Sequence, residues 1–102
     1  MKILLACSSG MSTSLLVSKM REAAENTGLD CEIWAVSQDK AEEEMQKADV
    51  LLIGPQMRFL KSKFKGKAKE IGIPLDVIEP MAYGRCDGKA VLNKAVQLVN
   101  ES

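Results

Sequence analysis

A loop of small polar residues around Cys7 is the part of this sequence best suited to chemistry. After Cys7 come a glycine, a methionine and five hydroxyl-bearing residues, in the order Ser8, Ser9, Gly10, Met11, Ser12, Thr13 and Ser14. Backbone amides at the start of a helix, together with hydroxyl groups, donate hydrogen bonds to an anion, and the helix dipole adds partial positive charge. Gly10 permits the tight backbone of an anion-binding loop. We therefore predict an anion site in which Cys7 is a reactive thiolate.

The same residues also have a purely structural explanation. A lone cysteine at the end of a strand is often a core residue, and serine and threonine are ordinary helix caps. The glycine and five hydroxyls directly after Cys7 favour the functional interpretation. The chain contains no histidine, so a Ser-His-Asp or Cys-His arrangement within it is excluded. Cys31 and Cys86 are widely spaced and form no Cys-x-x-Cys pair, and no metal site is expected.

Composition narrows the class of protein. The 102 residues are 46% hydrophobic and 27% charged, which suits a single globular domain over residues 1–102. Fourteen basic residues balance fourteen acidic ones, so no net charge attracts nucleic acid, and we expect no nucleic-acid partner. No apolar stretch approaches the ~20 residues of a membrane span, and the amino-terminal apolar run is too short for a signal peptide. These features predict a cytoplasmic protein with reduced cysteines.

Four short runs of Leu, Ile and Val predict strands over residues 3–6, 31–36, 50–53 and 75–78, and each is followed by a helical pattern. Nearly continuous apolar runs are typical of parallel strands covered by helices on both faces. Right-handed crossovers then bring the carboxyl ends of all strands to one edge. We predict an open, flavodoxin-like α/β sheet with strand order 2-1-3-4. That order places Cys7 and the turn at residues 54–56 in one crevice.

The helices that position this loop have recognisable ends. The first is expected to begin among residues 12–14 and to end at Gly28, and Ser37 is a candidate cap for the second. A third helical pattern covers residues 57–71 and ends at Gly72, and the last helix begins at residue 87 or 88. Tyr83 and Arg85 fall in a loop after the fourth strand, where an ordinary loop role and contact with a partner or a phosphocysteine are both open.

The cysteine loop resembles the phosphate loop of the low-molecular-weight tyrosine phosphatases, and the predicted fold is similar to theirs. In that family a cysteine at a strand end attacks a phosphoryl group. The family's Cys-x5-Arg motif needs an arginine where this chain has Thr13. Without the guanidinium group, charge on the transition state is held less well. A cysteine that can be phosphorylated at a site poorly equipped for hydrolysis suits a phosphoryl carrier better than a phosphatase.

Three segments together resemble one family of carriers. They are residues 6–16 (ACSSGMSTSLL), 48–56 (ADVLLIGPQ) and 83–88 (YGRCDG). The chain is similar to the enzyme IIB component of the bacterial sugar phosphotransferase system, in its lactose and cellobiose family. The serine-rich loop looks more like the cellobiose and diacetylchitobiose branch than the lactose branch.

The resemblance implies a two-step relay. Cys7 would accept a phosphoryl group from a histidine of the IIA protein and pass it to a cellobiose-, chitobiose- or lactose-type sugar bound by the membrane component IIC. Residues 8–14 would hold the phosphoryl oxygens, no metal or cofactor would be needed, and IIC would be the only link to the membrane. The alternatives are a stand-alone phosphatase or arsenate reductase-like enzyme, and a noncatalytic anion-binding module. Thr13 argues against the enzyme, and the position of Cys7 argues against the module.

A basic segment follows the third strand. It contains no acidic residue and consists of Arg58, Lys61, Lys63, Lys65, Lys67 and Lys69. We interpret it as a solvated helical face, with the steering of an acidic partner or an anionic membrane surface as the alternative.

Overall fold

The computed structural model describes residues 1–7 and 10–101, and for residues 10–12 it describes the backbone only. Strands and helices alternate along the chain. The elements are β1 (Lys2–Cys7), α1 (Gly10–Thr27), β2 (Glu32–Ser37), α2 (Gln38–Met45), β3 (Val50–Ile53), the 3-10 helix η1 (Pro55–Leu60), α3 (Lys61–Ile71), β4 (Leu75–Val77), α4 (Pro80–Gly84) and α5 (Gly88–Glu101).

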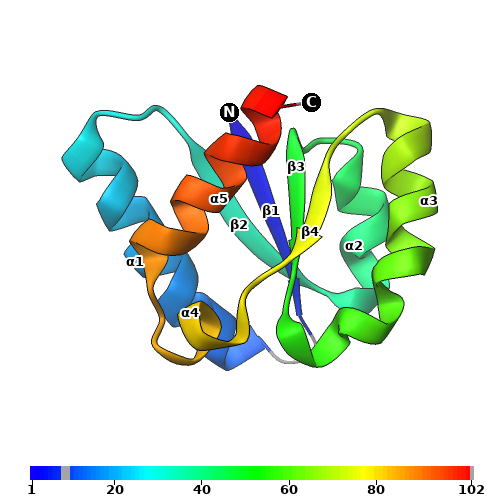
Figure 1. The fold of residues 1–102 in the computed structure, drawn as a ribbon, viewed down its shortest axis with the longest axis horizontal. Helices are drawn as coiled ribbons and strands as arrows, with labels where there is room; N and C mark the ends of the chain where they lie inside the picture. Colours follow the sequence, from blue (N-terminus) through cyan, green and yellow to red (C-terminus); the bar gives the residue numbers. More distant parts are fainter. Residues whose placement is uncertain (8–9, 102) are drawn as a thin grey trace.

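The four strands form one parallel sheet in the order β2-β1-β3-β4, which confirms the predicted topology. In the central strand, Leu4 pairs with Trp34 of β2 and with Leu51 of β3. Helices α1 and α5 cover one face of the sheet and α2 and α3 cover the other, as Figure 1 shows. The carboxyl ends of the strands lie at the lower edge of that view. The fold therefore brings the loops that follow the strands to a single edge.

Two separate cores explain why the strands read as continuous apolar runs. Successive side chains of a strand point to opposite faces of the sheet. Ile3 and Leu5 pack with residues of α1 and α5, whereas Leu4 and Ala6 pack with residues of α2 and α3. All four side chains are fully buried. Because helices cover both faces, β1 has no position that faces solvent from residue 3 onward.

Helices α1 and α3 end at the two glycines that the sequence analysis predicted. Gly28 and Gly72 follow α1 and α3 with φ of 75° and 91°, the left-handed conformation that glycine adopts without strain. Helix α1 starts at Gly10, before the predicted start. Ser37 occupies the N-cap position of α2, but its hydroxyl donates to the Asp39 carboxylate and makes no capping hydrogen bond to the helix backbone.

Two other expectations were wrong in detail. The single pattern over residues 57–71 is a 3-10 helix, η1, followed by α3, and both place apolar residues inward, as Met57 and Phe64 show. The two elements share one buried stripe, which is why the pattern looked continuous. The region expected to be a loop around Tyr83 contains the short helix α4, which begins at Pro80. Proline suits the first helical position because its missing N–H has no partner there.

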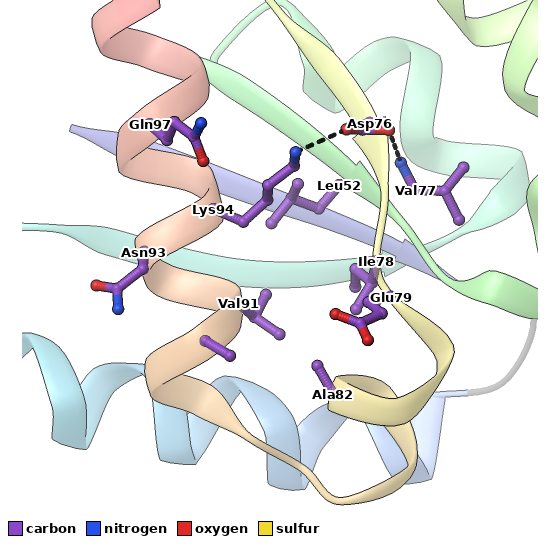
Figure 2. Close-up of a pocket in the computed structure, with 11 residues that line it drawn as sticks. Leu52, Asp76, Val77, Ile78, Glu79, Ala82, Val91, Asn93, Lys94 and Gln97 are labelled. Atoms are coloured by element: carbon purple, nitrogen blue, oxygen red, sulfur yellow. Dashed lines mark hydrogen bonds and ion pairs between the residues drawn. The ribbon is translucent and has the colours of Figure 1, made fainter.

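Edge strand β4 is held by a charged cluster centred on Asp76. The Val77 amide donates to Asp76 Oδ1 at 2.8 Å, and Lys94 Nζ of α5 lies 3.2 Å from Oδ2 (Figure 2). From the other side of the sheet, Lys61 Nζ lies 3.5 Å from Oδ1. Burial works to raise the pKa of this carboxyl group. The hydrogen bonds from Val77 and Lys94 and the charges of both lysines outweigh burial, so the pKa of Asp76 is lowered from its ordinary value.

Candidate functional site

Cys7 lies at the carboxyl end of the central strand. It pairs with Ser37 at the end of β2, and on the other side the Gly54 amide donates to the Ala6 carbonyl at 2.9 Å. The ends of β1, β2 and β3 therefore surround the cysteine, and Cys7 and residues 54–56 lie at the same edge of the sheet. The Cys7 side chain is only 2% exposed.

Thr13 is the residue that meets this sulfur. It lies near the start of α1, is completely buried, and donates a hydrogen bond from Oγ1 to Cys7 Sγ. The position at which the sequence departs from the phosphatase motif thus contacts Cys7 through a hydroxyl group instead of a guanidinium group.

The structure describes the other predicted loop residues to different extents. Ser8 and Ser9 lie outside the described residues, and Gly10, Met11 and Ser12 are described by their backbone only. Ser14 belongs to α1 and is exposed. The structure therefore brings Thr13 to Cys7.

Two further side chains extend this contact. From the sequence, residues 54–56 were expected beside Cys7 and contact of Tyr83 with a phosphocysteine was left open, but neither Gln56 nor Tyr83 was predicted to bind the phosphoryl group. Tyr83 Oη of α4 lies 3.5 Å from Thr13 Oγ1, and Gln56 Nε2 of η1 donates to Tyr83 Oη at 3.1 Å. Since Thr13 donates its hydrogen to sulfur, Tyr83 is the donor between the two hydroxyls. The donors then run in one direction, from Gln56 through Tyr83 and Thr13 to Cys7. Each hydrogen bond in such a chain polarises the next.

Gly54 makes room for this arrangement. A Cβ at this position would lie 2.8 Å from Gln56 Oε1 and 3.6 Å from the Ala6 carbonyl oxygen. Without a side chain at residue 54, the Gln56 amide folds back over the end of β3 and reaches Tyr83. The segments around residues 6–16, 48–56 and 83–88 converge here, so their shared resemblance to one family was the signal that could have identified Gln56 and Tyr83.

Two hollows on the surface lie apart from this site. A cavity of about 340 Å³ opens between β4, α4 and α5 (Figure 2). Its walls include Asp76, Glu79 and Lys94 and do not include Cys7 or Thr13. Arg85 lines a separate hollow against α1. Neither hollow contains the hydrogen-bonded chain that leads to the sulfur.

A parallel sheet in the order β2-β1-β3-β4, with helices on both faces and a buried cysteine at the end of β1, defines an open α/β protein of the flavodoxin-like class. The comparisons identify the family within that class. The model of the family described as "PTS system, Lactose/Cellobiose specific IIB subunit" matches residues 2–94. The chain belongs to this family of sugar phosphotransferase system components.

Individual relatives agree with that assignment. The chain is 59% identical over 98 residues to the oligo-beta-mannoside-specific EIIB component of Bacillus subtilis, covering 96% of this chain and 95% of the relative. It is 47% identical over 103 residues to the cellobiose-specific EIIB component of Lactococcus lactis, with the same coverage. The solution structure of the cellobiose-specific IIB component from Borrelia burgdorferi superposes with a TM-score of 0.82 at 36% identity, covering 99% of this chain and 93% of that one.

In the part of the chain that the structure describes, none of the helices combines the length and apolar character needed to cross a bilayer.

Proposed function

We propose that residues 1–102 form one IIB domain that carries a phosphoryl group on Cys7, between a histidine of the IIA protein and a sugar bound by the membrane component IIC. The observation that carries the proposal is the hydrogen bond from buried Thr13 to Cys7 Sγ, supported by Tyr83 and Gln56. Family membership supports the identity of both partners and a cytoplasmic place of action.

In the first step, Cys7 Sγ attacks the phosphorus atom of the donor phosphohistidine. The sulfur–phosphorus bond forms as the phosphorus–nitrogen bond breaks, and the proton of the thiol ends on the released imidazole. The partner supplies the histidine that this chain lacks. Thr13 stabilises negative charge on the sulfur as it attacks. Ser8, Ser9, Gly10, Met11, Ser12 and Ser14 are the further groups proposed, with Thr13, to hold the phosphoryl oxygens.

In the second step, a sugar hydroxyl attacks the same phosphorus atom. The oxygen–phosphorus bond forms, the sulfur–phosphorus bond breaks, and the proton of the hydroxyl returns to sulfur. The Thr13 hydroxyl now stabilises the departing sulfur, so one donor serves both directions of transfer. Neither step consumes ATP, because the phosphohistidine is already an activated donor.

Thr13 also supports a carrier over a phosphatase. A carrier must keep its phosphoryl group until the acceptor arrives, so hydrolysis of the phosphocysteine by water must be slow. An arginine at this position would hold the equatorial phosphoryl oxygens through two parallel hydrogen bonds, whereas a threonine offers one hydroxyl, already directed at sulfur. The site therefore favours transfer to a positioned acceptor.

The sugar is proposed to be a β-linked oligosaccharide. The relatives named above are specific for oligo-β-mannosides and for cellobiose, and the first has the higher identity to this chain. We expect IIC, which binds the sugar, to determine the choice between them.

Intact-mass measurement tests the carrier function directly. The chain is incubated with phosphoenolpyruvate, the general phosphotransferase proteins and the IIA protein of its own system. We expect a gain of one phosphoryl group in the wild-type chain and in Cys31→Ser, and none in Cys7→Ser. Cys31→Ser is the matched control because Cys31 lies before β2, away from the carboxyl edge. Failure of the wild type to gain a phosphoryl group from active phospho-IIA, with turnover of an aryl phosphate, would establish a phosphatase instead.

A further inference from the structure

Exposed apolar side chains border the Cys7 site and take no part in the chemistry proposed above. Among the described residues, the most exposed large apolar side chains are Phe59 of η1, at 75%, and Met81 of α4, at 61%. The same two elements supply Gln56 and Tyr83, which hydrogen-bond to each other at 3.1 Å. The two elements that carry these apolar side chains are therefore joined to each other at the site.

The geometry of η1 places Phe59 on the side of the site. In a 3-10 helix, side chains three residues apart lie on the same face. Met57 and Leu60 share the face that packs into the core formed with α2 and α3. Gln56 and Phe59 share a second face, and Gln56 is directed at Tyr83. Phe59 therefore projects from the same face of η1 as the residue that reaches over the site.

Charge is strongly separated in this chain despite its zero net charge. The basic segment, defined above as Arg58 and the five lysines up to Lys69, leaves eight basic residues against fourteen acidic ones in the rest of the sequence. Lys61 and Lys67 pair with carboxylates. Arg58 and Lys63 form no ion pair with any described residue. Arg58 precedes Phe59 directly in η1, and Lys63 follows in the first turn of α3, so basic residues flank the exposed phenyl ring in the sequence.

We propose that Phe59 and Met81, with Arg58 and Lys63 beside them, form the docking surface for the phosphoryl-donor protein. The identity of the donor rests on the proposed function. The partner surface that fits is acidic with an apolar centre, and it carries the phosphorylated histidine. A central aromatic anchor supplies most of the affinity in such interfaces. Surrounding basic side chains attract an anionic, phosphorylated partner and speed its association.

An anionic membrane surface would also attract exposed phenylalanine and basic residues. The position of the surface favours a protein as the partner. Cys7 is only 2% exposed, so the donor protein must pack around this edge for its histidine to reach the sulfur. A lipid layer on Phe59 and Met81 would cover the same approach.

Binding of unphosphorylated IIA protein, measured by calorimetry, tests the docking surface separately from transfer. We expect Phe59→Ser to raise the dissociation constant by roughly tenfold, since truncation of an interface anchor commonly has at least this effect. Leu29→Ser is the matched control, because Leu29 is also exposed, at 39%, but lies between α1 and β2 at the opposite edge of the sheet. We expect its dissociation constant to stay within about twofold of wild type. Replacing Arg58 and Lys63 with glutamine is expected to slow association at low salt and to have little effect at high salt.

The outcomes separate the two proposals. Equal affinity of Phe59→Ser and Leu29→Ser for IIA overturns the docking surface, and so does the absence of any binding by the wild type. Weakened binding in Phe59→Ser, in a chain whose wild type gains no phosphoryl group, supports the docking surface while the carrier function fails. If Phe59→Ser instead keeps its affinity for IIA and loses binding to phosphatidylglycerol vesicles, the surface is a membrane contact and the proposal is wrong.

Discussion

Replacing Gly88 with alanine probes the close contact between α5 and α1 that supports the site. A Cβ at residue 88 would lie 2.3 Å from the Lys19 carbonyl carbon and 2.5 Å from the Met20 amide nitrogen. Both are backbone atoms of α1, so a change of rotamer cannot relieve the overlap. The start of α5 would have to move by more than about 1 Å to reach the roughly 3.5 Å of an ordinary carbon contact.

The expected loss of stability follows from these distances. Forcing an extra methyl group into a packed interface costs about 1–3 kcal/mol, and contact with rigid backbone places this case near the upper end. The preference of helices for alanine over glycine offsets at most about 1 kcal/mol. A net loss of about 2 kcal/mol in the free energy of unfolding is expected. For a domain of this size that lowers the melting temperature by roughly 10 °C.

Thermal and urea unfolding of Gly88→Ala beside Gly66→Ala provides the test. Gly66 lies within α3, and a Cβ there would meet no atom within 4 Å. The same substitution should therefore raise the free energy of unfolding by about 0.5–1 kcal/mol at residue 66. Phosphorylation of Cys7 should slow only in Gly88→Ala, because the Asp87 amide ties the start of α5 to Ala82, next to Tyr83. If both variants change stability equally, the contact does not constrain α5 as argued.

Two further substitutions test the site and the edge strand. Thr13→Val removes the hydroxyl group that donates to sulfur, and it should slow phosphorylation of Cys7 by about tenfold in a quenched-flow mass assay. The rate for Thr13→Ser should stay close to that of wild type. Equal rates for the valine and serine variants would contradict a role for the hydroxyl group. Asp76→Asn should lower the free energy of unfolding by about 1 kcal/mol at neutral pH. Because the pKa of Asp76 is lowered in the folded state, its stabilisation is present above the unfolded value of about 4 and is lost as pH falls through the folded pKa. Urea titrations at successively lower pH below about 4 should therefore show a shrinking difference from wild type. A difference that persists there would refute the electrostatic explanation.

The sheet was predictable because its signals are local. Unbroken runs of Leu, Ile and Val mark strands that are buried on both faces, and β1 is buried in this way. Gly28 and Gly72 mark helix ends through a backbone conformation that other residues adopt with strain. The alternation of strands and helices indicates a parallel sheet, and the flavodoxin-like order, which the structure confirms, places the carboxyl end of β1 beside that of β3.

The hydrogen-bonded chain at the site was not predictable in the same way. Thr13 was noticed as the residue that replaces an arginine, but no pattern in the sequence indicated that its side chain turns toward Cys7. Tyr83 belongs to a helix of five residues, too short to show a helical period. Gln56 lies in a 3-10 helix whose inward residues also fit an α-helical stripe. Contacts between segments that are distant in the sequence require the fold to be known.

The strand order explains why the site needs each of these elements. Strand β4 is separated from β1 by β3, so Tyr83, which follows β4, must reach across the end of β3 to approach Thr13. A side chain at residue 54 would displace the Gln56 amide, and Gly54 leaves that space open. Gln56 then donates a hydrogen bond to Tyr83 Oη and fixes the direction of the Tyr83 hydroxyl group. Three loops that follow three different strands therefore act on one sulfur atom. A change in the packing of any of them should alter phosphoryl transfer even where Cys7 itself is untouched.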